Sequence, residues 1–174
     1  MPAPTHASSD GVAWETHRDT VQPDWIDYNG HMNVAFYVLV FDRSMDAFLD
    51  RLGIGSAYRA RSGRTIFAAE LHVTYKSEVK LGDPLKAESL LLGADAKRVH
   101  VFQRLFHADT NALIATCESL GLNVDQTARR VVPFTDDVVG VLAGVVAAHA
   151  ITAPPPEVGR RIAALAGSRH FTLP

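Results

Sequence analysis

The sequence is poor in the features that mark several large classes of protein. Its only cysteine, Cys117, excludes an internal disulfide framework and a cysteine-rich zinc site. A net charge of -2 provides no overall positive field of the kind that a dedicated nucleic-acid-binding protein needs. The longest apolar stretches, VAFYVLVF and VVGVLAGVVAA, fall well short of the roughly 20 residues that span a bilayer. We therefore expect a cytoplasmic protein with no nucleic-acid or membrane partner.

Several catalytic and ligand-binding motifs are also absent. The sequence has no G-x-S-x-G, P-loop or Rossmann glycine pattern, so no motif supports a serine hydrolase, an NTPase or a dinucleotide-binding protein. The eight histidines include no HExxH and no other compact spacing of metal ligands. We expect neither a metal site nor a cofactor.

Length and composition fit one globular domain. The chain has 174 residues, of which 47% are hydrophobic, enough for one core but too few for two. Residues 1–13 have neither the basic region nor the apolar region of a signal peptide, so we expect a disordered leader there. The domain is expected to span residues 14–150, and residues 151–174, which include the proline-rich APPPEVGRR, are expected to form a C-terminal tail.

The best-defined expected element is a helix over residues 34–52. Asn33 suits an N-cap, no glycine or proline interrupts the stretch, and Gly53 stands where a glycine commonly ends a helix. The first half of the helix is apolar on all sides, which predicts deep burial of its N-terminal end. We expect a first strand before it, around residues 16–26.

An antiparallel series of four strands is expected to follow, over residues 65–76, 84–93, 98–108 and 112–124. In residues 135–149 a capping threonine and two early aspartates favour a second helix, although the valines there leave a strand open. This order predicts an α+β domain in which one antiparallel sheet wraps around a central buried helix, with an additional C-terminal helix. Because such a sheet leaves an edge to cover, we expect a homodimer or a homotetramer.

Four polar residues crowd into seven positions just before the long helix: Asp27, Asn29, His31 and Asn33. One interpretation is structural: Asp27 and Asn29 build an Asx-type turn, Asn33 caps the helix, and His31 forms a local hydrogen bond. The other is functional. A helix N-terminus presents free backbone N–H groups that stabilise a developing oxyanion, and Asp27 beside it would supply a general base or a nucleophile.

The segment WIDYNGHMNVAFY resembles the active-site segment of the 4-hydroxybenzoyl-CoA thioesterase-like branch of the hot-dog superfamily, and the downstream YKSEVKLGDPL resembles that family's second strand and the following turn. The resemblance covers roughly residues 16–125 and implies a hot-dog fold that hydrolyses acyl-CoA thioesters. It implies that Asp27, three residues before Gly30, is the catalytic carboxylate. It also implies that the backbone N–H of Val34 forms the oxyanion hole.

More narrowly, PDWIDYNGHMNVAFYVLVFD is similar to thioesterases of bacterial carnitine degradation, which implies hydrolysis of betainyl-CoA to glycine betaine and CoA. Aromatic faces bind a trimethylammonium group well, and the aromatic residues in or near the segment are Trp25, Tyr28, Phe36, Tyr37, Phe41 and Phe67. The alternative is that most of them belong to the core. The expected catalytic set is Asp27, Val34, His31 and Asn33, and the expected substrate-binding set is Trp25, Tyr28, Asn29, Gly30, Tyr37 and Phe67.

Two other functions stay open. A hot-dog hydratase or dehydratase would use His31 as its acid–base group, although the extended histidine motifs resembling that branch are missing. A non-catalytic acyl-CoA-binding protein is also compatible, because a fold does not fix a function. In each case the CoA phosphates would meet surface cations, for which the sequence offers Lys76, Lys80, Lys97, Arg98, Arg61 and Arg64.

Overall fold

A computed structural model describes residues 12–150 and 153–162. The strands are β1 (Trp14–Thr20), β2 (Arg64–Tyr75), β3 (Pro84–Ala94), β4 (Arg98–His107), β5 (Leu113–Asp125) and β6 (Arg130–Val131). The helices are the single 3-10 turn η1 (Pro23–Trp25), α1 (Val34–Arg51), α2 (Ser56–Ser62) and α3 (Asp136–His149).

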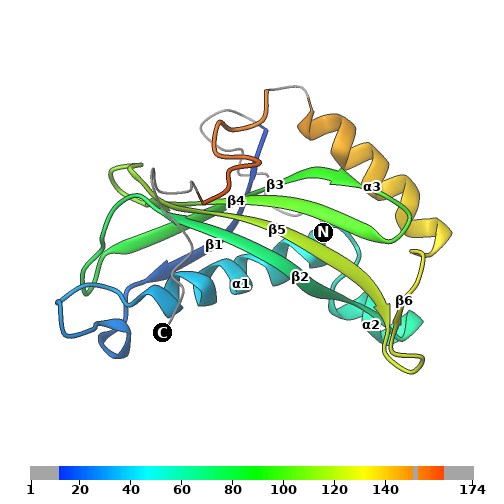
Figure 1. Ribbon diagram of the computed structural model, residues 1–174, viewed down its shortest axis with the longest axis horizontal. Coiled ribbons are helices and arrows are strands. Elements are labelled where there is room, and N and C mark those ends of the chain that lie inside the picture. The colour runs from blue at the N-terminus through cyan, green and yellow to red at the C-terminus, as the bar shows by residue number, and fades with distance from the viewer. Residues whose placement is uncertain (1–11, 151–152, 163–174) are drawn as a thin grey trace, which may run out of the picture.

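One antiparallel sheet organises the molecule. Its strand order is β1-β3-β4-β5-β2, and the short β6 pairs with β5. The sheet curls over α1, and α3 runs beside β3 (Figure 1). This arrangement confirms the predicted α+β hot-dog fold, with its central helix and its additional C-terminal helix. The strand β2 is long and lies at an edge of the sheet, so one of its sides has no neighbouring strand among the described residues.

The helix α1 begins and ends where the local signals predict. The Asn33 side chain accepts a hydrogen bond from the backbone N–H of Ala35, which confirms the N-cap. The chain leaves the helix through Gly53, whose φ of 74° is the left-handed conformation that glycine tolerates best. The helix therefore has a fixed N-terminal end, and the polar segment precedes it directly.

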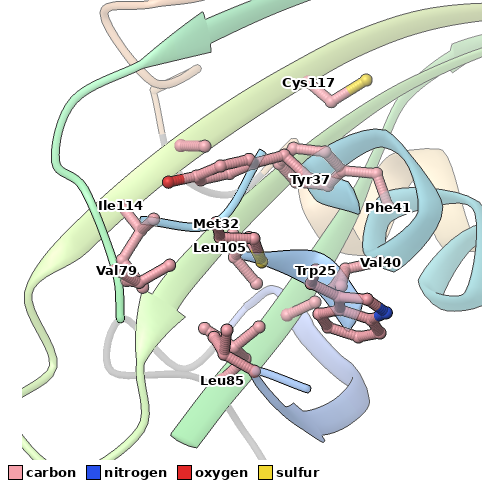
Figure 2. Close-up of a cluster of buried hydrophobic side chains, with 13 residues drawn as sticks. Trp25, Met32, Tyr37, Val40, Phe41, Val79, Leu85, Leu105, Ile114 and Cys117 are labelled. Carbon is pink, nitrogen blue, oxygen red and sulfur yellow. The ribbon is translucent and has the colours of Figure 1, made fainter. Parts of the chain in front are cut away.

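Two apolar clusters hold α1 against the sheet. The first half of the helix packs with the preceding segment and with β3, β4 and β5 in a cluster that includes Trp25, Met32, Tyr37, Val40 and Phe41 (Figure 2). The second half packs in another cluster with α2 and α3. Buried hydrogen bonds also fix the position of α1 on the sheet, because the Gln103 amide of β4 donates to Phe41 O and to Ser44 Oγ of the helix. The predicted deep burial of the N-terminal end of the helix is wrong, because Val34 and Ala35 are exposed and burial begins at Tyr37, on the face toward the sheet.

One expectation needs correction, two short elements were not predicted, and one open choice is resolved. The first strand was expected over residues 16–26 but occupies Trp14–Thr20, since Pro23 cannot donate to a strand and begins η1 instead. The elements α2 and β6 were not predicted, because they are too short to show a clear periodicity. Residues 136–149 form a helix, which resolves the choice between helix and strand.

The chain ends are partly described. Of the expected leader, residues 1–11 lie outside the described residues, whereas Ala13 is buried in a small cluster with Leu90 and Phe102. Of the expected tail, residues 153–162 are described, and we call them the C-terminal segment. They lie on the side of the sheet opposite α1 (Figure 1). No helix among the described residues is both long enough and apolar enough to cross a membrane.

Candidate active site

The turn before α1 is built around Asp27. Its carboxylate Oδ1 accepts the Asn29 N–H at 2.8 Å, and its backbone oxygen accepts the Gly30 N–H at 3.0 Å. Gly30 has a φ of 79°, a conformation that side-chain-bearing residues adopt only with strain. This Asx-type turn is the one that the structural interpretation predicted. It leaves Oδ2 of Asp27 without a hydrogen bond to any residue that the structure describes.

The N-terminus of α1 offers one unused donor. Of the first three helical N–H groups, that of Ala35 is bound by the Asn33 side chain and that of Phe36 by the Asn33 carbonyl. The Val34 N–H has no acceptor in the described part of the chain, and Val34 is 54% exposed. A free N–H at the positive end of a helix is suited to stabilise a negatively charged oxygen.

Asp27 and Val34 line the same open pocket, which has a volume of about 440 Å³. The opposite wall comes from the end of β2 and the residues after it. The lining residues are Asp27, Met32, Val34, Tyr37, Tyr75, Lys76, Ser77 and Glu78. Backbone hydrogen bonds fix the two walls together, since Met32 N donates to Val79 O at 2.9 Å. The relative position of the two pocket walls is therefore fixed by backbone hydrogen bonds of the fold.

Two tyrosines form the apolar side of this pocket. The rings of Tyr37 and Tyr75 meet edge to face with centroids 5.2 Å apart and an interplanar angle of 87°. Burial raises the pKa of Tyr37, and the nearby negative charges of Glu78 and Asp27 add to this shift. Burial also raises the pKa of Tyr75. Both phenols therefore stay protonated and uncharged at neutral pH.

His31 supports the turn from outside the pocket. Its backbone oxygen accepts the Asp27 N–H at 3.0 Å, and its Nε2 lies 3.2 Å from Glu78 Oε1. The residue thus joins the Asp27 turn to the segment after β2. This placement matches the local, organising role, because His31 is not among the residues that line the pocket.

The structure does not gather the expected aromatic residues around the pocket. Trp25 is buried and stacks on Phe36 at 5.4 Å, with the Arg43 guanidinium 5.6 Å from its ring centroid. Figure 2 shows Trp25 and the Tyr37 hydroxyl at different ends of the cluster. Phe41 is buried as well. The core interpretation therefore holds for these residues, and only Tyr37 of the six lines the pocket.

The remaining expected residues lie apart. Tyr28 is 97% exposed in the turn, and Asn29 is exposed beside it. Phe67 lies on β2 in a separate hollow with Val124, Gln126 and residues 129–131. Of the surface cations, only Lys76 lines the pocket, whereas Arg61 and Arg98 pair with Asp137 and Asp95 elsewhere.

The structure adds residues that the sequence analysis did not assign to the site. Tyr75, Ser77 and Glu78 line the pocket, although they are more than 40 residues from Asp27 in sequence. The available signal was the change from the apolar alternation of β2 to the polar KSE. Within the described residues, no group of three or more histidines, cysteines or acidic residues is placed to hold a metal ion.

Comparisons with known proteins find relatives of this chain. A family model for the thioesterase-like superfamily matches residues 21–142. A betainyl-CoA thioesterase from Pseudomonas aeruginosa is 35% identical over 147 residues, which cover 84% of this chain and 92% of the relative. An L-carnitine dehydrogenase/betainyl-CoA thioesterase from Rhizobium meliloti is 35% identical over 142 residues, which cover 82% of this chain and 28% of that protein. A Staphylococcus aureus protein solved in complex with CoA aligns with a TM-score of 0.80 and 27% identity, over 92% of this chain and 100% of that one.

Proposed function

The chain belongs to the thioesterase-like superfamily, and on this basis we propose that it hydrolyses a short acyl-CoA thioester in the pocket shared by Asp27 and Val34. One observation supports this most strongly. Asp27 and Val34 line the same open pocket, and each has a group that no other described residue binds: a carboxylate oxygen of Asp27 and the helix N-terminal N–H of Val34. Hydrolysis of a thioester needs two groups. One activates or supplies the attacking oxygen, and the other donates a hydrogen bond to the carbonyl oxygen as it becomes negative.

Two chemical routes use the same geometry. As a general base, Asp27 takes a proton from water while the water oxygen bonds to the carbonyl carbon, and the C–S bond then breaks to release CoA. As a nucleophile, a carboxylate oxygen of Asp27 bonds to the carbonyl carbon and expels the CoA thiolate, and water then hydrolyses the mixed anhydride. In both, the Val34 N–H stabilises the oxyanion. Asn33 acts by fixing the helix end, and Asn29 and Gly30 by shaping the turn.

For the acyl group we propose the betainyl group. The support is the similarity to two proteins with betainyl-CoA thioesterase in their names, together with the pocket walls. Tyr37 and Tyr75 provide ring surface, and Asp27 and Glu78 provide negative charge around one small cavity. A trimethylammonium group has no N–H to donate, so ring faces and negative potential are the features that bind it.

We also propose a homodimer formed through β2. This strand has one open edge, and Phe67, Leu71 and Tyr75 on it are 52%, 52% and 46% exposed. An exposed apolar edge of this length is a liability in an isolated chain. Pairing with the same strand of a second copy would cover it and keep two-fold symmetry.

A thioester panel tests the function. Thiol release from betainyl-CoA, acetyl-CoA, 4-hydroxybenzoyl-CoA and a long-chain acyl-CoA is followed under steady-state conditions. We expect the highest kcat/KM for betainyl-CoA, and a preference for the uncharged aromatic thioester would contradict the assignment. Loss of enoyl absorbance from crotonyl-CoA without thiol release would instead indicate a hydratase. Single turnover in H₂¹⁸O tests the nucleophilic route, because label in Asp27 requires that water attacked its carboxyl carbon in a mixed anhydride.

A further inference from the structure

A residue from outside the expected domain of residues 14–150 neutralises the one positive charge in the pocket lining. Asp27 and Glu78 are negative, and Lys76 is the only lysine or arginine among the described residues that line the pocket. The Lys76 ammonium lies 3.5 Å from Oε1 of Glu157, on the C-terminal segment. The Lys76 side chain is 30% exposed and that of Glu157 is 16% exposed, so solvent screens this ion pair less than one between fully exposed side chains.

Several contacts fix Glu157 in place. The Val158 N–H donates to Pro155 O at 3.0 Å, which closes a turn around Glu157. The Gly159 N–H donates to Oε2 of Glu118 on β5 at 2.7 Å, and Val158 packs against the apolar cluster on the same side of the sheet. The turn is therefore docked on the side of the sheet away from α1, with Glu157 directed at Lys76.

We propose that Glu157 is a specificity-determining residue, which neutralises Lys76 so that the pocket accepts a positively charged acyl group. This inference rests on the proposed thioesterase function and extends it to a residue that does not line the pocket. Without Glu157, Lys76 would leave an unpaired positive charge in the wall of the pocket, which would repel a quaternary ammonium group. With it, the remaining charges of the pocket are those of Asp27 and Glu78.

A pair of thioesters isolates this charge effect. Betainyl-CoA and 3,3-dimethylbutyryl-CoA have the same shape, because a carbon atom replaces the quaternary nitrogen, and they differ by one positive charge. The quantity measured is the ratio of their kcat/KM values in the wild type, Glu157→Gln, Lys76→Met and the double variant. Asp137→Asn is the matched control, since it removes the carboxylate of an ion pair at the far end of the molecule, by α2 and α3 (Figure 1).

We expect Glu157→Gln to lower the ratio about tenfold, mainly by slowing betainyl-CoA, since one unpaired charge in a partly screened pocket has an effect of this size. The double variant should recover the wild-type ratio, and Asp137→Asn should not change it. An unchanged ratio in Glu157→Gln, or an equal loss for both thioesters, would overturn the inference while leaving the thioesterase function intact. Equal changes for both thioesters in Lys76→Met would show that Lys76 binds the CoA phosphates, which also overturns it. If the wild type releases thiol from neither, the proposed function fails as well.

Discussion

The cap of α1 offers a way to separate stability from catalysis. Asn33 Oδ1 binds the Ala35 N–H at 3.0 Å, directly beside the free N–H of Val34. We consider Asn33→Ala, Asn33→Ser and Asn33→Asp. The alanine variant loses the cap, the serine variant keeps a neutral cap, and the aspartate variant keeps a cap but adds a negative charge at the proposed oxyanion site.

The expected stability changes follow from a single hydrogen bond. Ala35 is exposed, so water can replace the lost acceptor, and Asn33→Ala should lower the free energy of unfolding by about 1 kcal/mol. For a chain of this size that corresponds to a fall in Tm of about 3 °C. Asn33→Ser should stay within about 0.5 kcal/mol of the wild type. Asn33→Asp should be as stable as the wild type or slightly more so, because a carboxylate at a helix N-terminus is favourable.

The expected activities follow a different order. Two unit charges about 6 Å apart interact by about 3 kcal/mol at an effective dielectric constant near 20. The carbonyl oxygen carries only a partial negative charge in the transition state, and solvent in the open pocket screens the repulsion. We therefore expect the activation free energy to rise by about 1.4 kcal/mol in Asn33→Asp, which lowers kcat about tenfold. Asn33→Ser should keep most of kcat.

The assays are urea unfolding for stability and thiol release for kcat and KM separately. A repulsion between the new carboxylate and the CoA phosphates would raise KM, whereas a lost oxyanion site lowers kcat. If Asn33→Asp folds normally and retains the wild-type kcat, no oxyanion forms at the N-terminus of α1, and the proposed role of Val34 is wrong.

Two further predictions concern stability and assembly. Burial lowers the pKa of His149, whose Nδ1 accepts the Leu91 N–H at 2.9 Å; the unfolded chain then binds a proton more readily, so stability should fall as the pH drops below about 6.5. His149→Gln keeps an acceptor but cannot titrate, and urea unfolding between pH 8 and 5 should show a weaker pH dependence for it; an equal slope would exclude His149 as the cause. For the open edge of β2, Leu71→Asp should convert the dimer to a monomer in sedimentation equilibrium, and an unchanged mass would place the dimer interface elsewhere.

Local sequence signals predicted part of the fold and part of the site. Asn33 and Gly53 fixed the ends of α1 because capping and left-handed backbone depend on neighbouring residues only. The relation of Asp27 to Val34 was predictable for the same reason, since both belong to one turn and the helix after it. The Pro23 region shows the limit, because the apolar Trp25 and Ile26 resemble a strand while the proline excludes it.

The rest of the pocket depends on contacts between distant parts of the chain. Tyr75 and Glu78 reach Asp27 only because β2 pairs with β5 and the next segment bonds to Met32. Glu157 reaches Lys76 only because the C-terminal segment docks on Glu118. An aromatic residue near the motif could equally be core or site, and Trp25 and Phe41 proved to be core because α1 faces the sheet on that side. No local pattern distinguishes these cases.

The proposed role of Asp27 is tested most directly by kcat for Asp27→Asn beside Asp24→Asn. The two substitutions remove the same charge three residues apart, and Asp24 is exposed in η1 outside the pocket. Far-UV and near-UV circular dichroism confirm that each variant folds. We predict a fall in kcat of at least about 100-fold for Asp27→Asn, because both routes need the carboxylate, and no more than about a twofold change for Asp24→Asn. Turnover near the wild-type level in folded Asp27→Asn would contradict the proposed chemistry.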